Sequence, residues 1–143
     1  MFLGEYVHAI DDKSRLAVPA RFRQDLADGL YVTKGVDRCL YILTPDGWNR
    51  LADRIAGLPS MQAGVRQLQR HFFAGAAPLT PDKLGRIVIP QILREYAQLD
   101  GEVVVAGVHT RIELWSRAAW EAERERIDEQ TATLAEQMAS LGI

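Results

Sequence analysis

The chain has 143 residues, 48% of them hydrophobic and 25% charged, and a formal net charge of −2 at pH 7. This composition is typical of a folded globular protein and excludes global disorder, fibrous repeats and a multidomain enzyme. No apolar stretch approaches the roughly 20 residues of a membrane span, and the first residues lack the regions of a signal peptide. We therefore expect a cytoplasmic protein without a membrane partner.

The N-terminal part of the chain predicts two β-hairpins around one short helix. An alternating run over residues 5–10 is followed by turn residues and by the strand 15–18, which predicts the first hairpin. Pro19 ends that strand, and apolar residues at helical spacing predict a helix over 20–28. The second hairpin is predicted from the β-rich runs on either side of residues 35–38.

Helices are predicted after this part of the chain and again at the C-terminus. Thr44 is expected to cap a helix that ends near Gly57, and a second linker helix follows from Ser60. Near the C-terminus, Ser116 is expected to cap one long helix. Its apolar residues recur at steps of three and four, and they are Trp120, Ile127, Thr131, Leu134, Met138 and Leu141. This apolar seam is expected to pack on the chain's own barrel or on a neighbouring subunit.

The chain contains two copies of one unit. Residues 2–23 align without a gap on residues 73–94, and one inserted residue later the register resumes. Identical pairs are Gly4 and Gly75, Asp11 and Asp82, Arg15 and Arg86, Pro19 and Pro90, and Trp48 and Trp120. Such self-similarity at a nearly fixed offset indicates an internal duplication. The predicted divisions are a first repeat (1–48), linker helices (49–72), a second repeat (73–116) and a C-terminal amphipathic helix (117–143).

The duplication also predicts the fold class. A unit of about 45 residues with two hairpins and one short helix cannot close a hydrophobic core alone. The two copies must therefore interleave within one chain. We predict an α+β fold, mainly β, in which the tandem repeats form one swapped-hairpin barrel with flanking helices and a long C-terminal helix.

Charge is distributed unevenly along the chain. Residues 11–23 carry four bases against two acids, residues 82–94 carry three bases against one acid, and residues 113–137 carry three bases against seven acids. Two basic patches are therefore masked by an acidic C-terminal segment. An arginine fork can bind a phosphate or the O6 and N7 atoms of guanine, so basic hairpin tips are candidates for DNA contacts.

The candidate DNA-binding residues lie in the two duplicated loops. They are Lys13 and Arg15 in the first copy and Lys83 and Arg86 in the second. Secondary DNA contacts are assigned to Arg21, Arg23 and Arg94, for which a plain helix-surface charge is the alternative. Asp11 and Asp82 are interpreted as loop-orienting residues that pair with the arginines four positions later, and such ion pairs alone would pin the hairpin and contribute little.

The duplicated loops carry a resemblance to a known family. Both copies follow the order Asp-x-x-x-Arg, a short apolar strand, proline and a helix, first from Asp11 to Arg23 and then from Asp82 to Arg94. This pattern resembles the MraZ family of bacterial transcriptional regulators, which carries two AbrB-like swapped-hairpin domains in one chain. The likeness covers essentially the whole length. Ser14 stands where the family usually has the glycine that Gly85 supplies in the second copy.

The resemblance implies a sequence-specific DNA-binding regulator that assembles into rings. It also implies control of the division and cell-wall gene cluster, including the regulator's own promoter. The expected partners are double-stranded DNA and further copies of the chain, the expected location is the nucleoid within the cytoplasm, and neither a cofactor nor a small-molecule substrate is expected. The alternative is a non-catalytic ring that serves as a structural or partner-binding scaffold.

An enzyme is the competing class, because Asp11 and Asp82 occupy equivalent positions, as the two carboxylates of an aspartic protease do. That chemistry needs a small hydroxyl residue and a glycine directly after each aspartate, and neither loop has them. The three histidines show no metal-ligand spacing with one another or with Cys39, the single cysteine. We therefore expect no catalytic residue and no metal site.

Overall fold

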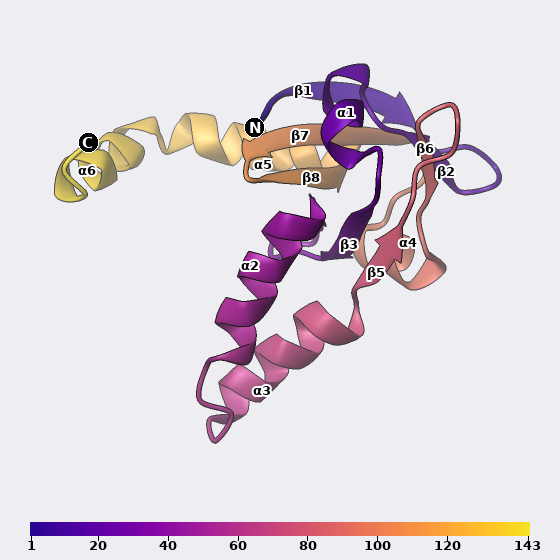
Figure 1. The fold of residues 1–143 in the computed structure, drawn as a ribbon. Coiled ribbons are helices and arrows are strands. Elements are labelled where there is room, and N and C mark those ends of the chain that lie inside the picture. The colour runs from indigo at the N-terminus through magenta and orange to yellow at the C-terminus, as the bar shows by residue number, and fades with distance from the viewer.

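A computed structural model describes all 143 residues (Figure 1). The eight strands are β1 (Phe2–Ala9), β2 (Arg15–Ala17), β3 (Leu30–Lys34), β4 (Leu40–Leu43), β5 (Ala77–Leu79), β6 (Arg86–Val88), β7 (Glu102–His109) and β8 (Arg111–Ser116). The six α-helices are α1 (Arg23–Leu26), α2 (Pro45–Ala56), α3 (Ala63–Gln69), α4 (Gln91–Ala97), α5 (Arg117–Glu129) and α6 (Thr131–Ser140). A 3-10 turn, Ala20–Phe22, precedes α1, and a π-helical turn, Arg70–Ala74, follows α3.

The strands form one antiparallel six-stranded sheet, in the order β1-β7-β8-β4-β3-β5, and a separate two-stranded ribbon of β2 and β6. Four of the six strand pairings join one copy of the repeat to the other, namely β1 with β7, β2 with β6, β3 with β5 and β4 with β8. When each strand is replaced by its counterpart in the other copy, the sheet order becomes β5-β3-β4-β8-β7-β1, which is the same order read from the opposite edge. The strand arrangement therefore has an internal pseudo-twofold axis.

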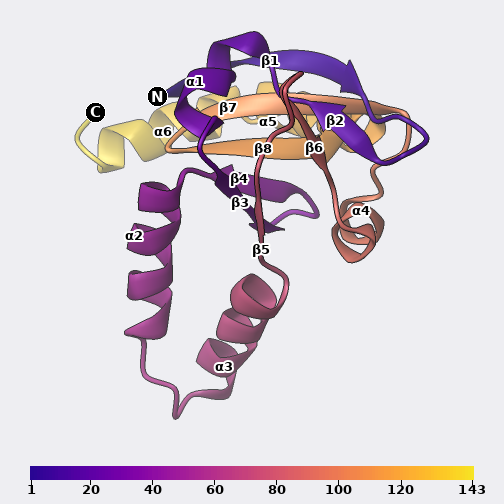
Figure 2. The same cartoon turned by 45° about the vertical axis from the view of Figure 1, so that its right-hand side comes forward.

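The expected α+β class is confirmed, but the fold is not mainly β, because its α-helices hold more residues than its strands. The expected single closed barrel is not formed. The edge strands β1 and β5 each have one hydrogen-bonded neighbour, and the ribbon lies apart as its own sheet. Figure 2 shows the ribbon in front of the sheet, with α2 and α3 projecting to one side. A short ribbon packed over an open sheet buries the apolar faces of both. The edge strands therefore do not need to pair with each other and close a barrel.

The second predicted hairpin of each copy is confirmed as β3–β4 and β7–β8, but the first is wrong. The turn itself exists, because the Asp11 N–H donates to the Arg15 carbonyl at 3.0 Å. The strands on either side then separate, β1 to the edge of the sheet and β2 to the ribbon. An alternating pattern identifies a strand and its buried face, but not the strand it pairs with.

One core holds the two copies together. Leu16 and Ile87 face each other at the centre of the ribbon and are almost fully buried. They belong to a cluster of 18 buried residues that includes Ile42 of β4 and Ile112 and Leu114 of β8. Both copies contribute residues to this cluster. Burial of the ribbon's inner face therefore depends on residues from both halves of the chain.

The predicted helix caps are confirmed, whereas the predicted single C-terminal helix is interrupted. The Thr44 hydroxyl accepts a hydrogen bond from Gly47 N at 3.0 Å, and the Ser116 hydroxyl accepts one from Ala119 N at 3.2 Å. At Gln130 the backbone leaves helical geometry (φ −102°, ψ 18°), and the Thr131 hydroxyl donates to the Asp128 carbonyl. Such a local hydrogen bond from a threonine competes with the helical pattern.

The two C-terminal helices differ in their packing. Trp120 of α5 lies 5.7 Å from Trp115 of β8, ring centre to ring centre, which fixes α5 on the sheet. Helix α6 extends away from the body (Figure 1). The later residues of the predicted apolar seam are 39–75% exposed, and they are Ile127 near the end of α5, Leu134 and Met138 of α6, and Leu141 directly after α6.

Gly107 should not tolerate a side chain, because β1 and β7 approach too closely there. A Cβ atom would lie 2.5 Å from Leu3 N and 2.6 Å from the Phe2 carbonyl carbon, both backbone atoms that cannot move aside separately. We expect Gly107→Ala to lower the free energy of unfolding by about 2–3 kcal/mol, measured by urea denaturation. The control is Gly64→Ala in α3, where a Cβ meets nothing within 4 Å. An unchanged urea midpoint for Gly107→Ala would contradict this packing.

Candidate nucleic-acid interface

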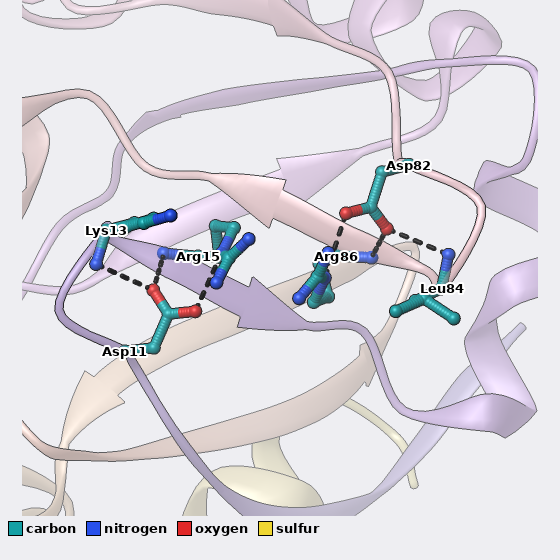
Figure 3. Close-up of polar contacts among 6 residues, drawn as sticks. All are labelled: Asp11, Lys13, Arg15, Asp82, Leu84 and Arg86. Atoms are coloured by element: carbon teal, nitrogen blue, oxygen red, sulfur yellow. Dashed lines mark hydrogen bonds and ion pairs between the residues drawn. The ribbon is translucent and has the colours of Figure 1, made fainter.

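The two duplicated arginines lie together on the outer face of the ribbon. Arg15 pairs with Val88 and Ala17 pairs with Arg86, while Leu16 and Ile87 between them face the core. Successive side chains of a strand point to opposite faces, so both arginines point outward and are diagonal neighbours. Figure 3 shows them side by side, with their loops leaving opposite ends of the ribbon. We call residues 11–17 and 82–88 the arginine ribbon.

Each arginine is held by the aspartate that begins its loop. Asp11 Oδ1 accepts hydrogen bonds from Lys13 N at 2.9 Å and Arg15 N at 2.8 Å, and Oδ2 accepts one from Arg15 Nε at 2.7 Å. Asp82 repeats the pattern with Leu84 N at 2.9 Å, Arg86 N at 2.9 Å and Arg86 Nε at 2.8 Å. The interpretation of both aspartates as loop-orienting residues fits these contacts (Figure 3).

The aspartates occupy only one nitrogen of each guanidinium. Nη1 and Nη2 of Arg15 and Arg86 make no hydrogen bond within the chain, and 30% of each side chain is exposed. A guanidinium presents its donors as a rigid planar fork, and fixing Nε fixes the direction of the other two nitrogens. Holding the fork before a partner arrives reduces the entropy lost on binding. Each arginine can thus offer two oriented donors to an external acceptor.

The carboxylates do not form a protease-like pair. Each accepts three hydrogen bonds inside its own loop, and the two lie at separate places along the ribbon (Figure 3). A catalytic aspartate dyad requires two carboxylates close enough to share a proton. The geometry at Asp11 and Asp82 is instead that of two separate braces.

The two loops share one backbone turn in spite of different residues. Ser14 has φ 63° and Gly85 has φ 75°, so both occupy the left-handed region. That region costs a residue with a side chain roughly 1–2 kcal/mol, a cost that glycine avoids. The first loop therefore reaches the same geometry with a less suited residue.

The lysines of the loops are not equivalent. In the repeat alignment Lys13 corresponds to Leu84 and Lys83 corresponds to Asp12. All four side chains are exposed, and neither lysine forms an ion pair in the chain. Each loop therefore places its lysine at a different point of the same turn.

Arg23 and Arg94 have a structural role that the sequence did not reveal. Arg23 Nε donates to the Val18 carbonyl at 2.8 Å, and Val18 N donates to the Gly85 carbonyl of the other copy at 2.8 Å. In the second copy, Arg94 Nε donates to the Ile89 carbonyl at 3.0 Å, and Ile89 N donates to the Ser14 carbonyl at 3.0 Å. These arginines brace the ends of the ribbon. Arg21 is exposed on its 3-10 turn.

Two other residues considered in the sequence are used in packing. His8 Nδ1 lies 2.7 Å from the Ala17 carbonyl and connects β1 to the ribbon. Cys39 is buried, its thiol donates to the Val36 carbonyl at 3.0 Å, and burial raises its pKa to about 12. A thiol with so high a pKa is almost entirely protonated near neutral pH and is a poor nucleophile.

The hydrogen bonds that Asp11 and Asp82 accept in their loops should make the folded state less stable at acidic pH. Hydrogen bonds from the Arg15 and Arg86 backbone N–H groups hold the pKa of Asp11 and of Asp82 below the ordinary value of 3.8. A lowered pKa means that each ionised carboxylate stabilises the folded state above pH about 4, and that this contribution is lost as pH falls through the lowered pKa. Between pH 5 and about pH 2, the melting temperature of the Asp11→Asn, Asp82→Asn double variant should therefore fall less than that of the wild type.

Calorimetry at a series of pH values measures this difference. Asp100→Asn, at an exposed aspartate outside the ribbon, is the matched control and should follow the wild-type curve. Identical acid sensitivity of the double variant and the wild type would show that the two braces do not contribute.

Comparison with known proteins identifies the family. The sequence model of the family described as "MraZ protein, putative antitoxin-like" matches the chain twice, over residues 1–71 and 72–141. The proteins named "Transcriptional regulator MraZ" of Moorella thermoacetica and Desulfitobacterium hafniense are 47% and 46% identical over 143 residues, which is 100% of each chain. The protein of that name from Roseiflexus castenholzii is 45% identical over 141 residues, 99% of each chain.

These relatives are named as regulators, a non-enzymatic class. None of the helices combines the length and the apolar character needed to cross a membrane. The duplicated architecture, the braced arginines and the full-length matches agree, and the chain belongs to the MraZ family of transcriptional regulators.

Proposed function

We propose that this regulator binds double-stranded DNA through the arginine ribbon. The observation that carries the proposal is the convergence of Arg15 and Arg86 on one outward face, each held by an aspartate and each with two unpaired nitrogens. Duplex DNA has local twofold symmetry, so a pseudo-twofold protein surface can present equivalent groups to its two strands. A two-stranded ribbon also fits the major groove, which is about 12 Å wide.

Different roles follow for the basic residues. Arg15 and Arg86 contact guanine edges or phosphates near the pseudo-twofold axis, since a braced fork suits bidentate acceptors. Lys13 and Lys83 contact phosphates from the loops, since a flexible ammonium acts as a point charge. Arg21, Arg23 and Arg94 add secondary contacts at the ends of the ribbon.

The distribution of charge over the fold supports this orientation. Leu114 of β8 faces the core under the ribbon, and its neighbour Trp115 points to the other face of the sheet, where Trp120 of α5 packs on it. The acidic helix α5 therefore lies on the face opposite the arginine ribbon. This separation keeps the negative charge away from the phosphates.

We also propose that copies of the chain assemble and that the assembly acts on particular genes. The exposed apolar residues of α6 support self-association. The family resemblance described in the sequence analysis implies a ring that acts on the division and cell-wall gene cluster, including the regulator's own promoter. A ring would place many arginine ribbons on one surface, so that one contact raises the effective concentration of the next. The preferred DNA would then carry repeated short elements about one helical turn, roughly 10 base pairs, apart.

A titration of the protein with its own upstream DNA over a series of salt concentrations tests the proposed function. Fluorescence anisotropy should give an affinity that falls steeply with salt, because phosphate contacts release counterions. Moving one element by half a turn should weaken binding far more than moving it by a full turn. Affinity that is independent of salt, or equal for the upstream DNA and a scrambled duplex, would contradict the proposal and favour a scaffold.

A further inference from the structure

A basic cavity lies on the face of the sheet opposite the arginine ribbon. It has a volume of about 270 Å³ and lies between helix α2, strand β4 and the turn from β7 to β8. Three of its eight lining residues are arginines, Arg50 and Arg54 of α2 and Arg111 of β8, and none is acidic. Tyr41 and Leu43 of β4 form part of its wall.

Two of these arginines have unsatisfied charge. Arg50 and Arg54 are four residues apart and therefore lie on one face of α2, and neither forms an ion pair with a carboxylate of the chain. Arg111 is different, because it pairs with the buried Glu113 at 2.8 Å and stacks over the Tyr41 ring at 4.8 Å. The cavity thus contains the guanidinium of Arg111, which Glu113 holds in place, and those of Arg50 and Arg54, which pair with no carboxylate.

The two copies of the repeat have different side chains at the position of this cavity. Leu43 in the first copy corresponds to Trp115 in the second, and Gly47 corresponds to Ala119. In the second copy, Trp115 packs against Ala119 and Trp120 and is buried. The smaller Leu43 leaves the corresponding space of the first copy open. The cavity is therefore a feature of this copy's side chains and not a requirement of the fold.

We propose that this cavity binds a small organic anion with a phosphate or carboxylate group and a short apolar body. Guanidinium groups recognise both kinds of oxyanion through paired hydrogen bonds, and the apolar body would lie against Leu43 and Leu51. Small-molecule sites commonly combine an apolar wall with a few polar groups that set orientation. The ligand would occupy the face opposite the ribbon and would not compete with DNA.

Titration of the full-length protein with phenyl phosphate, followed by amide chemical shifts, tests this inference. Saturable shifts are expected at Gly47, Thr110 and Arg111, while phenol, which lacks the charge, should give none. Benzoate and inorganic phosphate in parallel distinguish a carboxylate from a phosphate site and measure the contribution of the apolar body. The measurement is independent of DNA, so its failure and the failure of the proposed function are distinguishable.

Variants separate the cavity from general surface charge. Arg50→Ala and Arg54→Ala should each weaken phenyl phosphate binding about tenfold, whereas Arg70→Ala, at an exposed arginine outside the cavity, should not. Leu43→Trp, which introduces the residue that the second copy has at the equivalent position, should fill the cavity and abolish binding. Absence of saturation, equal binding of phenol, or equal binding by the Arg54→Ala and Arg70→Ala variants would overturn the proposal. A changed oligomer mass in the arginine variants, without anion binding in the wild type, would assign the cavity to a protein contact and also overturn it.

Discussion

The Arg15→Ala, Arg86→Ala double variant should lose at least about 30-fold in affinity for its upstream DNA while staying folded. One well-oriented arginine contributes about 1–3 kcal/mol to base discrimination, and the two side chains lie together on one surface. The folded state should change little, because these ion pairs are partly exposed and such pairs contribute little to stability. DNA titrations and thermal melts of the same preparation measure both effects.

Matched variants separate the arginine forks from charge in general. Lys13→Ala and Lys83→Ala should weaken binding similarly for all DNA sequences and should reduce its salt dependence. Arg70→Ala, outside the ribbon, should bind as the wild type does. A different outcome would contradict this prediction: the double arginine variant unfolds, but its remaining folded fraction binds DNA as tightly as the wild type. Arg15 and Arg86 would then stabilise the loops through their ion pairs without contacting DNA.

Neither half of the chain, residues 1–70 or 71–143, should fold as a monomer. Within the first half only β3 and β4 can pair, so β1 and β2 lose their partners β7 and β6. The inner face of the ribbon would also lose half of its core, since Leu16 packs with Ile87 of the other copy. A fragment of this size with so little buried apolar surface is expected to be unfolded.

Separate expression of the halves, with NMR spectra and light scattering, provides the test. Each half alone should give a poorly dispersed spectrum or associate with itself, and mixing them should restore the dispersed spectrum of the intact chain. A well-dispersed spectrum from either half at monomer mass would contradict the shared core.

The sequence predicted what depends on local chemistry. Thr44 and Ser116 cap helices as their residue types suggest, and the pairing of Asp11 with Arg15 follows from their spacing in a tight turn. The duplication predicted that two copies share one core, because each alone is too small. These inferences need only neighbouring residues or a comparison of the copies.

The sequence could not predict what depends on contacts between distant segments. The convergence of Arg15 and Arg86 follows from the pairing of β2 with β6, which the predicted hairpin of β1 with β2 did not include. The roles of Arg23 and Arg94 depend on carbonyls whose positions the other copy fixes. The basic cavity results from Leu43 standing opposite α2, a relation that only the folded chain displays.

Cross-linking from single cysteines tests contact between the arginine ribbon and DNA most directly. The native Cys39 is buried with a pKa raised to about 12, so a maleimide carrying a benzophenone should react only with an introduced cysteine. Leu84→Cys places the probe in the second loop, where the native side chain is 62% exposed, and Met61→Cys places it between α2 and α3, where the native side chain is 91% exposed. Illumination should join position 84 to the upstream duplex and leave position 61 unlinked. Equal or stronger cross-linking from position 61 would contradict contact of the arginine ribbon with DNA.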